Sequence, residues 1–510
     1  MKLIAKLLGF EAGRNLVVLG VRDAEELDVR TADRVRLRSD GREVMAIATI
    51  ARAFPQGRIG LFEEVASSLE VGEGSLVEVE AAPPPDSLAY VRKKLAGGRL
   101  REDEVRAIVR DIVSGYLSDV ELAAFITAVY LWGFSIDEAY SFTKAMVETG
   151  ETLNLGVKPV LDKHSMGGVP GDKTSLILVP VIASLGFYIP KTSSRAITSP
   201  AGTADRMEVL APVALSVEEV RRVVLKVGGC IVWGGALGLA PADDMIIRVE
   251  YPLGVDPFYL PSILAKKVAV GSTHVVLDIP TGRGTKVKSV VEARDIAREF
   301  MDLASMLGLR MEAVVTYGDE PIGRAVGPAL EAREALEALM GRGSPDLVNK
   351  AVGLAGVLLD MIEAGGRNAA LDALRSGRAL RKMREIIEEQ GGDPNVRPED
   401  LPVGDKRLTV RAEEDGYVMF IDNSLVARIG RLAGAPRDKG AGVMLYVKVG
   451  DRVRRGDPLF TVYAESGARL QAVEKLLEEA LPVSVGRGAA ARMLLERVLP
   501  KPKTITLLER

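Results

Sequence analysis

Two loops rich in glycine, serine and threonine constrain the fold of this chain more than any other feature. The first covers residues 162–175 and the second covers residues 191–203. An apolar run that we expect to form a strand precedes each loop. Backbone N–H groups in such loops can approach an oxyanion closely, and hydroxyls and cations complete its shell. The pair therefore predicts an enzyme that holds phosphate against a phosphorylated substrate.

Apolar runs that alternate with helical segments predict a central, mostly parallel α/β sheet domain over residues 151–400. Residues 159–161, 176–182 and 230–233 are expected to be buried strands, and residues 216–227 a helix. Ligands of such sheets bind outside the carboxyl ends of the strands, where both loops fall.

The remaining segments predict three further parts of a multidomain α/β chain. Alternating apolar residues over 1–84 indicate a β-rich, barrel-like N-terminal module that ends in a proline-rich linker. Residues 85–150 predict a helical domain, joined by part of 240–270, with Ser-x-x-Glu capping boxes at Ser118 and Ser135. Residues 401–510 predict an α+β module similar to a biotinyl or lipoyl hammerhead, but they lack the Met-Lys-Met type of carrier turn, so we expect a structural role.

Composition excludes several classes of function for the 510 residues. The net charge of −3 argues against a broad nucleic-acid surface, and we expect no membrane-spanning segment. One cysteine and two histidines make a disulfide framework or a zinc site improbable. These observations predict a cytoplasmic protein with no metal and with neither nucleic acid nor membrane as a partner.

Each feature of the loops also has a structural explanation. Residues 171–174 resemble part of a P-loop, but position 166 is Met where that motif needs Gly. His164 is either a substrate contact or a structural side chain, whereas His274 and Cys230 are expected to be structural. The loops contain the carboxylates of Asp162, Asp172 and Asp205. We expect these to be turn or structural groups rather than catalysts or Mg²⁺ ligands.

The two loops resemble those of the thymidine and pyrimidine nucleoside phosphorylases. The resemblance rests on Asp-Lys-His-Ser-x-Gly-Gly-Val at 162–169 and on Ser-Ser-Arg followed by Gly-Thr-x-Asp-x-x-Glu within 193–208. It covers about residues 85–480, and with the N-terminal module the whole chain is similar to the archaeal AMP phosphorylase subgroup. Pro170 and the sequence of 197–203 depart from the nucleoside enzymes and favour a pocket for a 5′-phosphate.

The resemblance implies which residues bind the substrates. The attacking phosphate would contact Lys163, Ser165, Ser175, Ser193 and Thr203, which we expect to lie without a nearby carboxylate pair. The nucleotide would contact Gly168, Lys286 (with Lys288 as the alternative), Ser194, Arg195, Ala196, Ile197, Thr198 and Ser199.

The base and the leaving group would be handled by a later segment. Ser262 and Lys266 match the positions of base recognition, the alternative for Lys266 and its neighbour Lys267 being ordinary surface charges. Asp256 matches the proton donor and would be kept protonated by an apolar or crowded site, the alternative being a helix cap.

The implied reaction is phosphorolysis of a nucleoside 5′-monophosphate, in which AMP and phosphate give adenine and ribose 1,5-bisphosphate. Phosphate is a co-substrate, so no organic cofactor is expected, and the terminal modules suggest a homo-oligomer, a dimer or larger. The alternatives are a thymidine or pyrimidine nucleoside phosphorylase, a more distant phosphoribosyltransferase, and a non-catalytic nucleotide-binding scaffold.

Overall fold

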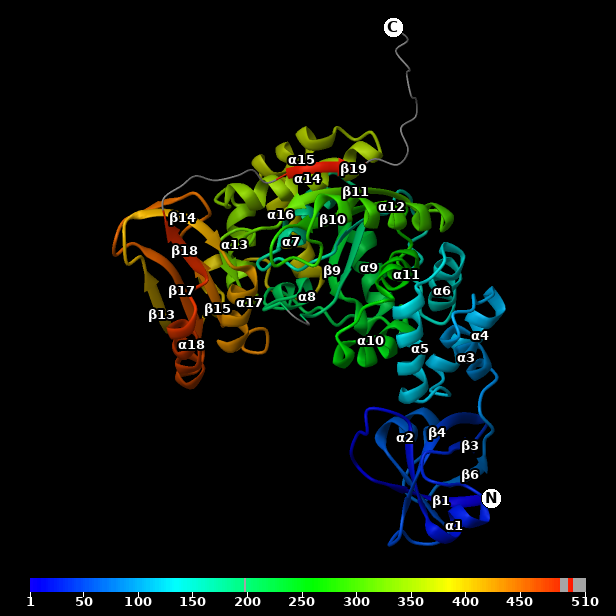
Figure 1. The fold of residues 1–510 in the computed structure, drawn as a ribbon. Helices are drawn as coiled ribbons and strands as arrows, with labels where there is room; N and C mark the ends of the chain where they lie inside the picture. Colours follow the sequence, from blue (N-terminus) through cyan, green and yellow to red (C-terminus); the bar gives the residue numbers. More distant parts are fainter. Residues whose placement is uncertain (197–198, 487–493, 499–510) are drawn as a thin grey trace. The chain divides into compact units, whose positions relative to one another are not determined.

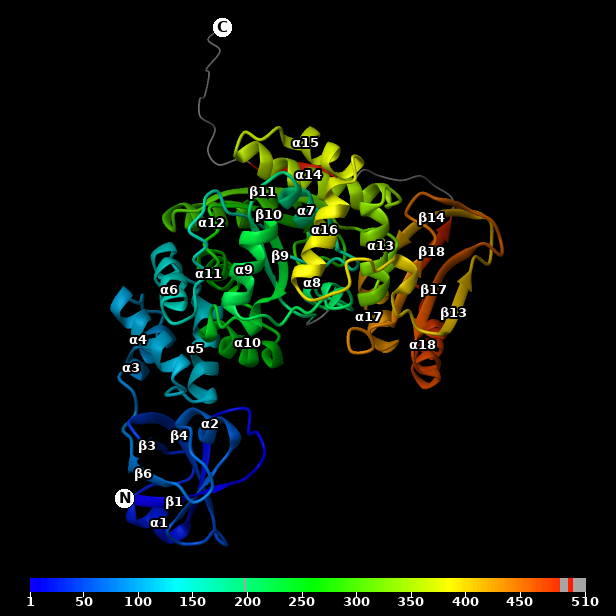
Figure 2. The same cartoon turned by 180° about the vertical axis from the view of Figure 1, so that it is seen from behind.

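The computed structural model describes residues 1–196, 199–486 and 494–498, and it divides the chain into two compact units (Figures 1 and 2). Unit 1 consists of Met1–Gly150 and Ala240–Ala265. Unit 2 consists of Glu151–Leu239 and the described part of Lys266–Arg510. Among these described residues, no helix combines the length and the apolar character needed to cross a membrane.

The first part of unit 1 is a closed barrel with the strand order β1-β5-β2-β4-β3-β6, which confirms the barrel-like prediction. Alternation produces it: Val35 and Leu37 are buried, whereas Arg34 and Arg36 are partly exposed and Arg38 is exposed. Its elements are β1 (Lys2–Leu7), β2 (Leu16–Gly20), α1 (Val21–Glu26), β3 (Arg34–Ser39), β4 (Arg42–Ala51), β5 (Arg58–Leu61), α2 (Glu63–Leu69) and β6 (Leu76–Ala81).

The rest of unit 1 is helical, as predicted. Ser118 and Ser135 accept hydrogen bonds from the backbone N–H groups of Glu121 and Glu138, so both capping boxes form. Phe125, Phe142 and Phe258 pack together in the core with ring centroids 5.6 to 5.8 Å apart. The helices are α3 (Ser87–Leu95), α4 (Glu102–Val113), α5 (Asp119–Trp132), α6 (Ile136–Glu148), α10 (Pro241–Leu253) and the start of α11 (Tyr259–Ala269).

Unit 2 contains the predicted α/β domain. Its strands β7 (Leu161–Ser165), β10 (His274–Thr281) and β11 (Arg310–Tyr317) are parallel, and β19 (Leu494–Val498) adds an antiparallel edge. A bridge between Val160 and Tyr188 continues the sheet to the parallel pair β8 (Ile189–Ser193) and β9 (Gly229–Trp233). The helices are α7 (Thr174–Ser184), α8 (Thr203–Met207), α9 (Val217–Val227), α12 (Val290–Met306), α13 (Pro328–Leu339), α14 (Pro345–Met361), α15 (Gly366–Arg375) and α16 (Arg378–Glu389).

The prediction of a strand at residues 176–182 was wrong, because these residues lie inside helix α7. Every residue from 174 to 183 is buried, and α7 contacts α14, α16, β8 and β9. A helix that is enclosed on all sides has no polar face, so its sequence reads as a continuous apolar run and carries no helical period. The strand predicted at 159–161 begins later, at Leu161, whereas the one predicted at 230–233 begins one residue earlier, at Gly229. The first residues of both loops belong to β7 and β8.

The C-terminal module is α+β, as predicted, and it shares a sheet with the preceding domain. The strand β12 (Ala325–Val326) pairs with β15 (Gly442–Leu445) in the order β12-β15-β17-β13. A second sheet has the order β16-β14-β18. The further elements are β13 (Lys406–Arg411), β14 (Gly416–Ile421), α17 (Asn423–Leu432), β16 (Arg452–Val453), β17 (Pro458–Ala464), α18 (Gly467–Glu479) and β18 (Val483–Gly486).

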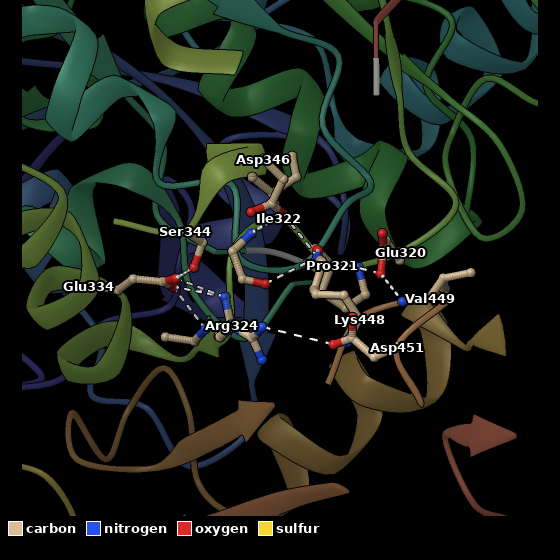
Figure 3. A network of polar contacts seen from close by, with 12 residues as sticks. Glu320, Pro321, Ile322, Arg324, Glu334, Ser344, Asp346, Lys448, Val449 and Asp451 are labelled. Atoms are coloured by element: carbon tan, nitrogen blue, oxygen red, sulfur yellow. Dashed lines mark hydrogen bonds and ion pairs between the residues drawn. The ribbon is translucent and has the colours of Figure 1, made fainter. Parts of the chain in front are cut away.

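Lys448 fastens this module to the segment that follows β11 (Figure 3). Its ammonium donates to the carbonyl of Pro321 and, at 3.2 Å, to that of Gly323, and it lies 2.9 Å from a carboxylate oxygen of Asp346. The backbone N–H of Val449 donates to Glu320 at 2.9 Å. Burial raises the pKa of Glu320, whereas Lys448 lowers the pKa of Asp346.

Replacement of Lys448 by Met should destabilise unit 2. The side chain of Asp346 is nearly buried, and the change removes the cation that pairs with it. Loss of one partner of a buried pair costs about 3–5 kcal/mol. Urea denaturation followed by circular dichroism measures the effect. Lys406→Met is the matched control, since Lys406 pairs with an exposed aspartate on the surface and its loss should cost less than about 1 kcal/mol. Equal losses for the two variants would contradict the anchoring role of Lys448.

Candidate functional site

The loops of the candidate site leave one edge of the parallel sheet. Residues 166–173 follow β7, residues 194–202 follow β8, residues 282–289 follow β10 and residues 318–324 follow β11. Because parallel strands run in one direction, their carboxyl ends meet at the same edge, where ligands of such sheets bind.

Two lysines and two aspartates form a buried network under the first loop. Lys350 on α14 lies 2.9 Å from Asp278 on β10 and 3.4 Å from Asp172. Lys163 lies 3.8 Å from Asp172 and 3.7 Å from Asp278, which is longer than a direct hydrogen bond. Ser165 donates to Asp278 at 2.9 Å. The network is formally neutral, and Lys350 makes its short contacts.

The expectation that Lys163 and Ser165 lie without a nearby carboxylate pair was therefore wrong. Asp278 is 113 residues away from Ser165 along the chain, and only the pairing of β10 with β7 brings the two together. Lys350, which sequence reasoning also missed, pairs with both carboxylates and so balances the negative charge that they bring to the site. A lysine in the middle of an otherwise apolar helix such as α14 is the one sequence signal that could have indicated it.

Cations crowd the region around this network. Burial lowers the pKa of His164 well below its usual value, and nearby lysines add to the effect. Burial likewise lowers the pKa of Lys191 to about 7, with Lys267 contributing. Lys267 itself is held by Asp162 at 2.7 Å. Positive potential of this kind is what an anion site requires.

The second loop is fastened by ion pairs. Arg195 makes two hydrogen bonds to Glu208, at 2.5 and 2.8 Å, and it contacts Asp205 at 3.3 Å and the ring of Trp233. The hydrogen bond from Arg195, aided by Lys439, lowers the pKa of Glu208 to about 2. The guanidinium of Arg195 is thus engaged with its own domain.

The backbone of the second loop closes on Gly202. A methyl group at Gly202 would lie 2.7 Å from the nitrogen of Ala196 and from the carbonyl oxygen of Ser194, so only glycine fits. Ser193 donates to the carbonyl of Ser194 at 3.2 Å. Ser175 is buried in the first turn of α7, and Thr203 begins α8. Ile197 and Thr198 lie outside the described residues.

A cavity of about 640 Å³ joins three loops of the site. It is lined by Gly168, Ser199 and Lys286, together with residues of α17. Gly168 has a φ of +87°, and a methyl group there would lie 2.7 Å from the backbone nitrogen of Lys286, so a side chain would separate these loops. The ammonium of Lys288 donates instead to the carbonyl of Thr285, which favours Lys286 as the cavity residue.

The residues predicted to handle the base lie on α11 and the segment before it. Asp256 belongs to unit 1 and is exposed, whereas the sequence led us to expect an apolar or crowded environment for its carboxyl. Ser262 and Lys266 are one turn apart on α11, and both are partly buried. The boundary between the two units falls within this helix, after Ala265.

Other sequence alternatives are settled by burial. The ammonium of Lys173 is inaccessible to solvent and donates to Glu334 at 2.6 Å and to the carbonyl of Ile322, so it is no P-loop lysine. Cys230 is buried in β9, as expected, and burial raises the pKa of its thiol to about 12. His274 contacts the neighbouring Thr273.

Two observations concern other ligands. Within the part of the chain that the structure describes, His, Cys, Asp and Glu side chains form no group of three or more that could hold a metal ion. A separate cavity of about 520 Å³ lies among α13–α16, and none of the described residues predicted for the site lines it.

Comparisons with known proteins match the same parts of the chain. The description "Glycosyl transferase family, helical bundle domain" matches residues 88–150, and the a/b domain of that family matches residues 157–380. The description "Pyrimidine nucleoside phosphorylase C-terminal domain" matches residues 417–484. A crystal structure of anthranilate phosphoribosyltransferase from Thermus thermophilus is similar in fold, with a TM-score of 0.50, 22% identity, and coverage of 59% of this chain and 98% of that chain.

These matches define a glycosyl transferase with a helical bundle, an α/β domain and the C-terminal domain of nucleoside phosphorylases. AMP phosphorylase from Thermofilum pendens is 60% identical over 100% of both chains. AMP phosphorylase from Pyrococcus furiosus is 49% identical over 94% of this chain and 97% of its own. The chain belongs to the AMP phosphorylase family.

Lys350→Met should lower the free energy of unfolding by about 3–5 kcal/mol at pH 7, because Asp172 and Asp278 would then share only Lys163. Chemical denaturation measures the loss. Lys226→Met removes an exposed ammonium of the same unit that pairs with Glu389, and it serves as the control.

The loss of unfolding free energy caused by Lys350→Met should be smaller in acid. Lys163 and Lys350 hold the pKa of Asp172 well below its usual value, so this aspartate stabilises the wild type above its unfolded pKa of about 4. That stabilisation disappears as pH falls through the lower folded pKa. Without Lys350 the carboxylates protonate more readily, so the two proteins should differ less at pH 4 than at pH 7. A difference that stays constant with pH would show that Lys350 acts through packing alone.

Proposed function

We propose that this protein catalyses the phosphorolysis of nucleoside 5′-monophosphates, converting AMP and phosphate to adenine and ribose 1,5-bisphosphate. The observation that carries the proposal is the cavity in which Gly168, Ser199 and Lys286 meet, lined by loops that leave the same sheet edge as the strand of Lys163. Two relatives of nearly equal length that bear the name AMP phosphorylase support the choice of substrate.

The reaction requires one bond to form and one to break at C1′ of the ribose. An oxygen of the attacking phosphate bonds to C1′ while the bond from C1′ to the base nitrogen breaks, and the base accepts a proton. The sugar passes through a state with oxocarbenium character, which the negative charge of the phosphate stabilises. The enzyme must therefore hold one anion below C1′ and supply one proton at the base.

In our proposal the attacking phosphate contacts Lys163, Ser165, Ser175, Ser193 and Thr203. The charge around Lys163 is compatible with this role, since Lys350 shares the two carboxylates of the network and leaves it neutral, and a bound anion would favour the protonated form of the nearby Lys191. An ammonium and hydroxyls are suitable donors to phosphate oxygens.

The nucleotide would be held by Gly168, by residues 194–199 and by Lys286. Ser262 and Lys266 are the proposed contacts to the base, and Asp256 is the proposed general acid. Because Asp256 is exposed in unit 1, the bound base would have to supply the crowded surroundings that keep its carboxyl protonated. Because Arg195 is bound by Glu208, its contribution within the second loop would be to support the backbone.

We propose further that inorganic phosphate is a co-substrate and that the reaction uses no organic cofactor or metal ion. A cytoplasmic homo-oligomer of two or more chains is the proposed assembly, and light scattering coupled to gel filtration would measure it.

The purified protein should release adenine from AMP only when phosphate is present. Adenosine should be cleaved with a kcat/KM lower by about three decades, since two or three charge-assisted hydrogen bonds to the 5′-phosphate would be absent. Chromatography of the free base from AMP, adenosine, CMP, UMP and thymidine, with and without phosphate, measures this. Release from thymidine or uridine alone would establish nucleoside phosphorolysis instead, and release from none would favour a binding scaffold.

Asp256→Asn should reduce kcat by about a hundredfold or more and change KM much less, because general acid catalysis contributes roughly 10²–10⁴ to the rate. Steady-state kinetics with AMP would measure both constants. Asp244→Asn, a change of the same type on α10, is the control. A kcat near that of the wild type would exclude Asp256 as the general acid.

A further inference from the structure

Two arginines of the C-terminal module line the same cavity as Lys286. Arg428 and Arg431 come from α17, and with Lys286 they are three cations around one space of about 640 Å³. None of the described residues that line the cavity is acidic. A cavity of this charge favours a dianionic group such as a phosphate ester.

The spacing along α17 determines which side chains face the cavity. Ser424, Arg428 and Arg431 are four and three residues apart, so they lie on one face of the helix. Val426 and Ile429 on another face are buried in the core of the C-terminal module. Core packing therefore sets the rotation of α17 and turns the arginine face toward the cavity.

Close contacts hold α17 against three loops of the site. Asn423 donates to the carbonyl of Gly318 at 2.7 Å and to that of Arg283 at 3.3 Å, in the segments that follow β11 and β10. Near its other end, a methyl group at Gly430 would lie 2.9 Å from Pro200, which directly follows Ser199. The helix is thus held at both ends by the loops that line the cavity.

Arg428 has donor capacity for a ligand. It is exposed, and within the described part of the chain its guanidinium forms neither an ion pair nor a hydrogen bond. Arg195, by contrast, is already bound by Glu208. A guanidinium presents a planar pair of N–H donors that matches two oxygens of a phosphate group.

We propose that Arg428 and Arg431 bind the 5′-phosphate of the nucleotide and thereby make the C-terminal module the part that distinguishes a nucleotide from a nucleoside. This proposal rests on the proposed function. Inorganic phosphate has similar chemistry, but its proposed site is formed by Lys163 and its neighbours. Loss of the two arginines should therefore weaken the binding of AMP and leave KM for inorganic phosphate nearly unchanged.

Arg428→Gln, Arg431→Gln and the double variant test the proposal in the full chain. Each single variant should lower kcat/KM for AMP by about ten- to a hundredfold, and the double variant should lower it further. KM for inorganic phosphate should change by less than about twofold. Titration calorimetry with AMP and with adenosine in phosphate-free buffer measures binding without turnover, and only the Kd of AMP should rise. Arg437→Gln, an exposed arginine of the same module outside the cavity lining, is the control.

Three results would overturn the proposal. These are an unchanged Kd of AMP in the double variant, an equal rise of the Kd for AMP and adenosine, and a rise of KM for phosphate with unaltered AMP binding. Failure of the proposed function would look different, since the wild type itself would then release no base from AMP. Thermal melts of Arg428→Gln and the wild type should coincide, because this side chain is exposed.

Discussion

The buried carboxylate of Asp278 is the interaction on which the arrangement of the candidate site depends. It lies on the middle strand β10 and accepts hydrogen bonds from Thr316 on β11 at 2.7 Å and from Ser165 at the end of β7 at 2.9 Å. Lys350 on α14 supplies the opposite charge. A buried charge is tolerated only when it is compensated, so Asp278 holds two neighbouring strands and one helix in a single arrangement. Asp278 also lies 3.7 Å from Lys163, so it helps to position the end of β7 from which the first loop leaves.

The C-terminal module is a second constraint, because it forms one wall of the cavity. The pairing of β12 with β15 joins it to the α/β domain, and Lys448 binds two carbonyls of the intervening segment (Figure 3). Asn423 then positions α17 against the loops that follow β10 and β11. The part that α17 takes in lining this cavity agrees with the structural role that the missing carrier turn predicts.

Much of the fold was predictable because it depends on local patterns. The capping boxes at Ser118 and Ser135 use groups three residues apart, and the alternation around Val35 needs only the period of a strand. The interpretation failed for residues 176–182, where burial on all sides removes the polar face that marks a helix. It failed also for the surroundings of Lys163, because Asp278 and Lys350 are distant in sequence and no spacing connects them to the loop.

The sequence by itself determined the two Gly- and Ser-rich loops, the types of side chain in them and the strand that precedes the first, because these depend on residues close together in the chain. The resemblance to nucleoside phosphorylases could be read from the same loops. Only the tertiary structure decided that Lys350 pairs with the carboxylates beside Lys163, that Lys286 rather than Lys288 lines the cavity, and that arginines of α17 line it too. Those contacts join residues that are distant in the sequence, and they arise from strand pairing and helix packing, which no local pattern records.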